Sequence, residues 1–401
     1  MTKMARNERA EEDLKYATGF LKPILGSIGA WPAPPDSSSF MRFLQKTEHV
    51  FTYILFSLTI VPGLSYAFLK ERDGKVRLKF MLPIFNTCVQ FCKYWILVYR
   101  AKNIQNGLNM IRNDWIEASE ENRLIFRSKA KLGRRVVLIA GATIYGGGLC
   151  YRTILPYLTG TVVTANNVTI RPLPCSVYFV FFNEQQTPNY EIIFIMQAMT
   201  GFIAYSVICG TCGICALFVF HACSMLKILV NKINALADKT DITEALVHRK
   251  IADIVEYQTK IKGYLKNIET VTEYICLADV VGGTVLVCLL YYCLLLELEN
   301  NNTTAVVVYI TLQISYSFCI FILCYIGQLL IDENYVVGLS SCTVNWYRLP
   351  MRHARSLIMI IAMSNYPIRI TAGKMCEMSL ATFTDVMKVA VGYFNILRKV
   401  I

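Results

Sequence analysis

The stretch IIFIMQAMTGFIAYSVICGTCGICALFVFHACSML, residues 192–226, decides the fold class of this chain. It runs for 35 residues without a formal charge, whereas roughly 20 predominantly apolar residues are enough for a helix to cross a bilayer. The stretch is therefore typical of a transmembrane helix. Its excess length predicts that the helix continues well beyond the membrane.

The composition of the whole chain also favours a membrane protein. Of 401 residues, 55% are hydrophobic and 17% are charged, whereas soluble domains carry about 25% charged residues. The net charge of +12 could indicate nucleic-acid binding. However, most Lys and Arg residues lie in segments between apolar runs, which is the pattern of cytoplasmic membrane loops.

Six further apolar segments are candidates for membrane spans. They are residues 50–69, 80–99, 136–158, 280–296, 303–331 and 378–397. The last is the weakest, because Asp385 and Lys388 lie within it. The sequence therefore predicts an all-α, polytopic membrane protein with seven transmembrane helices. Residues 240–270 carry apolar side chains at helical spacing between charges, which predicts a helical extension outside the membrane.

The positive charges predict the orientation of the chain. With a cytoplasmic N-terminus, the inner segments carry 29 Lys and Arg residues and the outer segments carry 9, as the positive-inside rule requires. The first outer loop, residues 70–79, runs against this bias. We expect a cytoplasmic N-terminus, an extracellular C-terminus and no cleaved signal peptide, because the polar start of the chain has no apolar core.

Glycosylation sequons give an independent indication of the orientation. Asn167, Asn301 and Asn302 each begin an Asn-x-Ser/Thr sequence, and all fall in segments placed outside. We therefore expect these asparagines to be glycosylation sites. Cys150 and Cys175 flank one outer segment, so an oxidised pair between them stays open.

The sequence predicts neither an enzyme nor a cofactor. Cys209, Cys212 and Cys215 resemble a thiolate cluster, but their spacing places them along one stripe of an apolar helix, where a packing role is the better explanation. Residues 146–148, three glycines, lack the spacing of a dinucleotide-binding loop. The four histidines are scattered, and no nucleophile can be paired with a base.

The seventh predicted span carries a polar stripe. Asp385, Lys388, Gly392, Asn395 and Lys399 follow one another at steps of three and four, so they share one helix face roughly 80° wide. Such a stripe lines a pore when several copies surround an axis. The alternative is an Asp385–Lys388 pair that packs against a neighbouring helix, and the sequence leaves both explanations open.

Several motifs, taken in order and spacing, resemble the insect odorant receptor family. They are CYIGQL at 324–329, Glu333-Asn334, Trp346-Tyr347, YPIRITAGK at 366–374, Met378-Ser379-Leu380, Phe383, Lys388, GYFNIL at 392–397 and, near the start, Gly29-Ala30-Trp31-Pro32. The related gustatory receptors share the architecture. The Trp31-Pro32 and Trp346-Tyr347 segments favour the odorant branch.

The resemblance implies an odorant-gated cation channel, a tetramer generally formed with a common co-receptor subunit in the plasma membrane of olfactory sensory neurons. In such a channel the outer half of the seventh span lines the pore. The matching gate position is Ile396, with Val400 one turn further out. Asn395, Arg398 and Lys399 depart from the co-receptor pattern, so this chain resembles a ligand-binding subunit.

The resemblance also divides the chain into functional segments. Residues 1–48 form a cytoplasmic segment, 49–226 the first four spans on the ligand-binding side, 227–272 a cytoplasmic extension of the anchor, 273–331 spans five and six, 332–377 an anchor half-helix with its linker, and 378–401 the pore-lining helix.

In the family, the odorant pocket lies in the outer half of the bundle among spans two, three, four and six. The candidates at that depth are Phe85, Val89, Tyr145, Gly148, Tyr151, Met199, Ile203, Tyr309, Gln313 and Tyr316. An apolar, aromatic pocket suits a small volatile ligand. The alternative for any one of these residues is simple packing between helices.

Other function classes remain as alternatives. A metabotropic seven-span receptor requires an external N-terminus, and the Asp-Arg-Tyr and NPxxY motifs of G-protein-coupled receptors are absent. A secondary transporter would show uptake rather than ligand-evoked current, and no internal repeat is visible.

Overall fold

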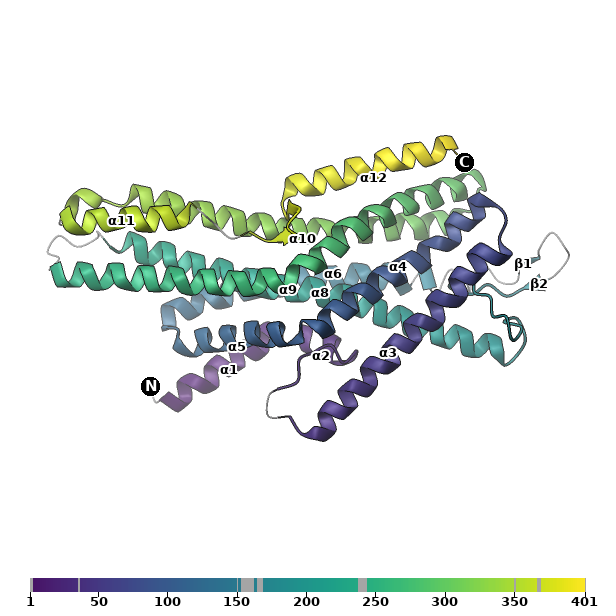
Figure 1. Ribbon diagram of the computed structural model, residues 1–401, viewed down its shortest axis with the longest axis horizontal. Coiled ribbons are helices and arrows are strands. Elements are labelled where there is room, and N and C mark those ends of the chain that lie inside the picture. The colour runs from purple at the N-terminus through teal and green to yellow at the C-terminus, as the bar shows by residue number, and fades with distance from the viewer. Residues whose placement is uncertain are drawn as a thin grey trace.

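Seven helices of more than 20 residues make up the body of the molecule in the part that the structure describes (Figure 1). They are α3 (Ser39–Ser65), α4 (Gly74–Tyr99), α6 (Glu120–Leu149), α8 (Asn189–Asn234), α9 (Glu244–Glu299), α10 (Thr303–Thr343) and α12 (Leu380–Val400). The computed structural model describes residues 3–34, 37–149, 151–152, 162–163, 169–236, 244–349, 351–365 and 369–400. The predicted all-α fold is confirmed.

Each predicted span overlaps one of these helices, although the outer end of the third extends past the described end of α6. By length and composition, α3, α4, α8, α9 and α10 are able to cross a membrane. The described part of α6 begins with charged residues of the preceding segment, and most of the outer end of this predicted span lies outside the described residues. α12 carries Asp385 and Lys388, which lower its hydropathy.

Shorter elements connect the long helices. The helical ones are α1 (Lys3–Thr18), α2 (Leu21–Gly26), α5 (Ala101–Glu117), α11 (Met351–Ser364), the π-helical turn η1 (Tyr66–Lys70) and the 3₁₀ turn η3 (Trp346–Arg348). Two short antiparallel pairs are the described exceptions to the all-α prediction. β1 (Val162–Val163) pairs with β2 (Thr169–Ile170), and β3 (Thr371–Ala372) pairs with β4 (Cys376–Glu377).

α8 is the central helix of the bundle. Of its most apolar 18-residue window, 89% is buried inside the protein, and it contacts α3, α4, α6, α9 and α10. A helix that is apolar on every side is stable where neighbours cover every side. The long charge-free stretch therefore reflects burial in protein on most of its surface, in addition to its membrane-spanning length.

The long helices extend far beyond a membrane. α9 has 56 residues, so its axis is about 84 Å long at 1.5 Å per residue, whereas the hydrocarbon core is about 30 Å thick. The extensions of α8, α9 and α10 lie beside α11 at one end of the molecule, opposite the end that carries the C-terminus (Figure 1). The helical prediction for residues 240–270 is confirmed for residues 244–270.

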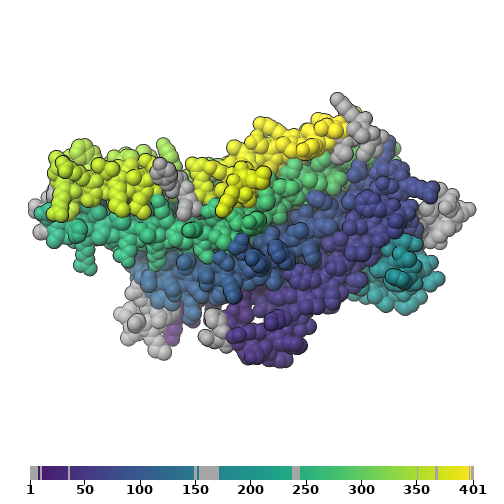
Figure 2. Space-filling model, viewed as in Figure 1, coloured from purple at the N-terminus to yellow at the C-terminus, as the bar shows by residue number. Residues whose placement is uncertain are grey.

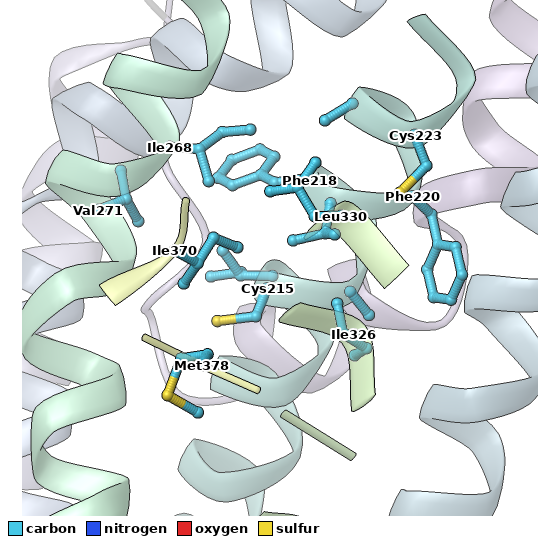
Figure 3. Close-up of a cluster of buried hydrophobic side chains, with 14 of the residues drawn as sticks. Cys215, Phe218, Phe220, Cys223, Ile268, Val271, Ile326, Leu330, Ile370 and Met378 are labelled. Carbon is cyan, nitrogen blue, oxygen red and sulfur yellow. The ribbon is translucent and has the colours of Figure 1, made fainter. Parts of the chain in front are cut away.

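The linker before α12 is buried in the bundle. Figure 3 shows Ile370 and Met378 among side chains of α8, α9 and α10, including Cys215, Ile268 and Ile326. The amide of Met378 donates to the carbonyl of Ile370 at 2.9 Å, which closes the β3–β4 hairpin. The start of α12 is thereby attached to the core.

Candidate functional site

α12 packs against the rest of the chain along one face. Val386 and Ala390 are buried, and the ring of Phe394 lies 5.9 Å from the ring of Tyr291 in α9. In Figure 2, α12 forms a ridge along the top edge of the molecule, beside the α9 segment. The other side of α12 is therefore exposed in the single chain.

The uncovered side carries the polar residues of the predicted stripe. Asp385 and Lys388 lie 3.8 Å apart, and the side chain of each is 73% exposed. Gly392 and Asn395 are exposed, and Ile396 is 57% exposed. The side chains of Asp385 and Lys388 thus point away from the neighbouring helices of this chain. The side chains of Lys399 and Val400 lie outside the described part.

The linker contacts α10 directly at the base of α12. A Cβ atom at Gly327 of α10 would overlap the carbonyl oxygen of Met378, so this glycine permits the two backbones to touch. On the other side, the amide of Gly373 donates to the carbonyl of Glu273 in α9 at 2.9 Å. The base of α12 is therefore held against both α10 and α9.

Two adjoining cavities lie between the helices toward the end that carries the C-terminus. The first has about 310 Å³ of space not filled by atoms, including space at its mouth, and is lined by Leu82, Pro83, Asn86, Tyr151, Arg152, Tyr205, Leu286, Leu290, Leu312 and Tyr316. The second has about 230 Å³ and is lined by Ile144, Gly148, Tyr205, Ile208, Leu312, Ser315, Tyr316 and Cys319. They share Tyr205, Leu312 and Tyr316 as walls. We refer to both as the outer cavities.

Three of the ten candidate pocket residues, Gly148, Tyr151 and Tyr316, line the outer cavities. Two more lie beside them, because the ring of Tyr309 is 6.1 Å from that of Tyr151 and the ring of Tyr145 is 6.4 Å from that of Tyr205.

The other five candidates lie elsewhere. Phe85 packs on the cluster around Leu82, Val89 contacts the backbone of α9 at Gly282, and Ile203 is buried. Gln313 is buried and, within the described structure, its amide has no hydrogen-bond partner. Met199 is 42% exposed on the outside of α8.

Sequence reasoning did not select several lining residues. Leu286 and Leu290 bring α9, the fifth span, into the cavity wall, whereas the expected pocket involved spans two, three, four and six. Asn86 and Arg152 provide polar groups. Arg152 had a visible signal, since it is a charged residue at the outer end of an apolar run.

The structure describes two of the three expected glycosylation sites. Asn301 and Asn302 are exposed between α9 and α10, and the Asn302 side chain caps α10 by accepting from the amide of Ala305 at 3.3 Å. Asn167 and Cys150 lie outside the described residues. Cys175 is a buried free thiol.

A buried polar cluster joins α5, α8 and α9 at the opposite end. Nε2 of His221 lies 2.9 Å from one carboxylate oxygen of Asp114, and Nζ of Lys260 lies 2.6 Å from the other. Burial alone would raise the pKa of Asp114, but the hydrogen bonds and charges of His221 and Lys260 outweigh it and hold that pKa below its usual value. The cluster therefore stabilises the ionised carboxylate.

Comparisons with known proteins agree with this architecture. Residues 74–391 match the family described as 7tm odorant receptor. Odorant receptor 13a of Drosophila melanogaster is 22% identical to this chain, and the alignment covers 93% of each of the two chains. Odorant receptor 30a of the same organism is 20% identical, and the alignment covers 87% of this chain and 89% of the relative. The structure of the olfactory receptor OR5 from Machilis hrabei in complex with eugenol superposes with a TM-score of 0.80, at 16% identity, over 97% of this chain and 100% of its own.

Proposed function

This chain belongs to the 7tm odorant receptor family, and from that premise we propose that it is a ligand-binding subunit of an odorant-gated, non-selective cation channel. As a member of this family it is an odorant receptor and a multi-pass membrane protein. The channel, its pore helix and its partner subunits are the proposal.

The uncovered polar face of α12 carries the proposal. Asp385 and Lys388 lie in an apolar helix and are each 73% exposed in the single chain. Ionisable side chains inside a membrane are costly in contact with lipid, and they face protein or a water-filled cavity instead. Several copies of this face around one axis would form a polar pore. Ile396 lies on the exposed side and is positioned to narrow that pore.

The inner end of the molecule supports assembly with other subunits. In the proposed orientation the far end of α10, the turn η3 and α11 lie in the cytoplasm, yet they expose large apolar side chains. These are Tyr335, Leu339, Trp346, Tyr347, Met351, Ile358 and Met359. Clusters of exposed apolar residues mark protein interfaces. We assign this surface to contacts within a tetramer that includes the common co-receptor subunit.

The outer cavities are the proposed ligand site. OR5 from Machilis hrabei was solved in complex with eugenol, and small lipophilic volatiles of this kind suit cavities lined by aromatic and aliphatic side chains. Leu290 of α9 lines the first cavity, and the adjacent Tyr291 contacts Phe394 of α12. A ligand that shifts α9 would therefore change the population of α12 positions directly.

Recording from cells that express this chain tests the proposal. We expect volatile compounds to evoke a cation current when this chain is co-expressed with the co-receptor. We also expect the protein to lie in the plasma membrane, which in the animal is that of olfactory sensory neurons. An epitope tag at the N-terminus should stain after permeabilisation, and one at the C-terminus should stain before it. Surface-expressed protein without evoked current, or an external N-terminal tag, would refute the channel proposal.

A further inference from the structure

Arg152 is a buried cation in the wall of the first outer cavity. Only 3% of its surface is exposed, and it lines the cavity beside Tyr151, Tyr205 and Asn86. Removing a guanidinium from water is costly unless hydrogen bonds and an opposite charge compensate it. Whether the charge of Arg152 is already compensated by the protein therefore bears on which ligands this cavity binds.

The partners of Arg152 in the described structure are neutral. Nη1 donates to the carbonyl of Gln197 at 2.8 Å, and Nη2 donates to the hydroxyl of Thr87 at 3.4 Å. A further side-chain hydrogen bond joins the guanidinium to the phenol oxygen of Tyr205. A guanidinium has more N–H donors than these three oxygens occupy. The titratable groups around it are phenols and a thiol, those of Tyr151, Tyr205, Tyr316 and Cys175. None of the ion pairs found within the described ranges includes Arg152, so no described carboxylate lies within 4.0 Å of its nitrogens.

α8 is shaped to hold this side chain. A Cβ atom at Gly201 would overlap Cδ of Arg152, so the glycine permits the arginine to lie against the helix. The lining of the cavity also includes the apolar side chains of Leu82, Leu286 and Leu290. The cavity thus combines one cation with an apolar lining, and no carboxylate is among the described residues that line it.

We propose that Arg152 recognises a carboxylate, so that the ligands of this receptor are small carboxylic acids bound as anions with their hydrocarbon part against α9. The inference rests on the proposed function, because it names the ligand class of the outer cavities. A carboxylate matches the planar guanidinium with charge-assisted hydrogen bonds. An amine on the same skeleton would place two cations together, which the site rejects.

Matched ligands test the proposal in the full channel, with this chain and the co-receptor co-expressed. The probes are the acid, alcohol, methyl ester and amine of a phenylethyl skeleton and of a series of straight alkyl skeletons, applied at neutral pH. We expect the acid to be the most potent compound on its best skeleton and the amine to be silent. Arg152→Gln should raise the half-maximal concentration for the acid by about tenfold or more, because hydrogen bonds to charged groups are lost. The alcohol should keep its potency within about twofold.

Further variants keep the test decisive if Arg152→Gln reaches the surface poorly. Gly201→Ala displaces the guanidinium without removing its charge and should weaken the acid response selectively. Arg152→Lys should retain part of the preference for the acid. Lys75→Met removes an exposed cation from the start of α4 and should change neither response.

Two results would overturn the proposal. One is a wild-type channel on which acid and alcohol are equally potent, and the other is a parallel loss of both responses in Arg152→Gln and Gly201→Ala. A surface-expressed wild-type channel that no odorant opens would instead refute the proposed channel function, so the two failures are distinguishable.

Discussion

Lys93 of α4 and Asp279 of α9 form an ion pair of 2.7 Å, although they are 186 residues apart in the sequence. Lys93 is fully buried and the Asp279 side chain is 16% exposed. Lys93 is the charge that interrupts the second predicted span, and the pair explains why a membrane helix tolerates it. α4 and α9 both line the first outer cavity, so the pair links two walls of the proposed ligand site.

Lys93→Met should destabilise the receptor strongly. Removing one partner leaves the other as an uncompensated buried charge, which typically costs about 3–5 kcal/mol. The double variant Lys93→Met/Asp279→Leu should recover most of the loss, and Lys75→Met at the exposed start of α4 should have no effect. Thermal stability of the solubilised receptor, followed by size-exclusion chromatography, measures this. A double variant as unstable as the single one would contradict it.

Asp114→Asn should lower stability at neutral pH, with a pH dependence of known sign. The folded-state pKa of Asp114 is below its usual value of 3.8, so its stabilising contribution is present above that value and is lost as the pH falls through the folded-state pKa. The melting temperatures of wild type and Asp114→Asn should therefore differ at pH 7 and converge as the pH falls below 3.8. Glu121→Gln, at an exposed position of α6, is the control. A difference that stays constant with pH would contradict this assignment.

Ile396→Ser should raise the basal current or change ion permeability in the channel formed with the co-receptor. A polar side chain at a hydrophobic constriction favours wetting of the pore. Val391→Thr introduces a hydroxyl at an exposed position on a different side of α12 and should alter gating less. Whole-cell recordings without odorant and in exchanged cation solutions measure both. Unchanged conductance and gating in Ile396→Ser would contradict the placement of Ile396 in the pore.

Gly327→Ala should impair both stability and gating, because the added methyl group overlaps the backbone of Met378 at the base of α12. Overpacking of this kind typically costs about 1–3 kcal/mol. Gly263→Ala, in α9 with open space around its Cβ position, should instead stabilise its helix by up to about 1 kcal/mol. Melting temperature and odorant-evoked current are the measurements. Equal behaviour of the two variants would show that the linker contact is unimportant.

The candidate site could be predicted from the sequence only where a single helix determines it. The stripe on α12 depends on the helical repeat alone, and Asp385, Gly392 and Asn395 lie on its exposed side. The pocket depends on how several helices meet. Met199 has the expected depth in the bundle but faces outward, while Leu286 comes from a helix that was not expected to contribute. Depth along the membrane normal does not determine the rotation of a helix about its axis.

The sequence by itself determined the helical membrane architecture, the places of the long helices along the chain, the polar side of α12 and the family to which the chain belongs. These follow from local composition and the 3.6-residue period, which need no knowledge of neighbouring helices. The tertiary structure alone decided that Lys93 pairs with Asp279, that α8 is enclosed by other helices, and that Arg152 lies against Gly201 at the cavity wall. Those contacts depend on crossing angles and axial positions of helices far apart in the chain, because side-chain packing between their surfaces selects them.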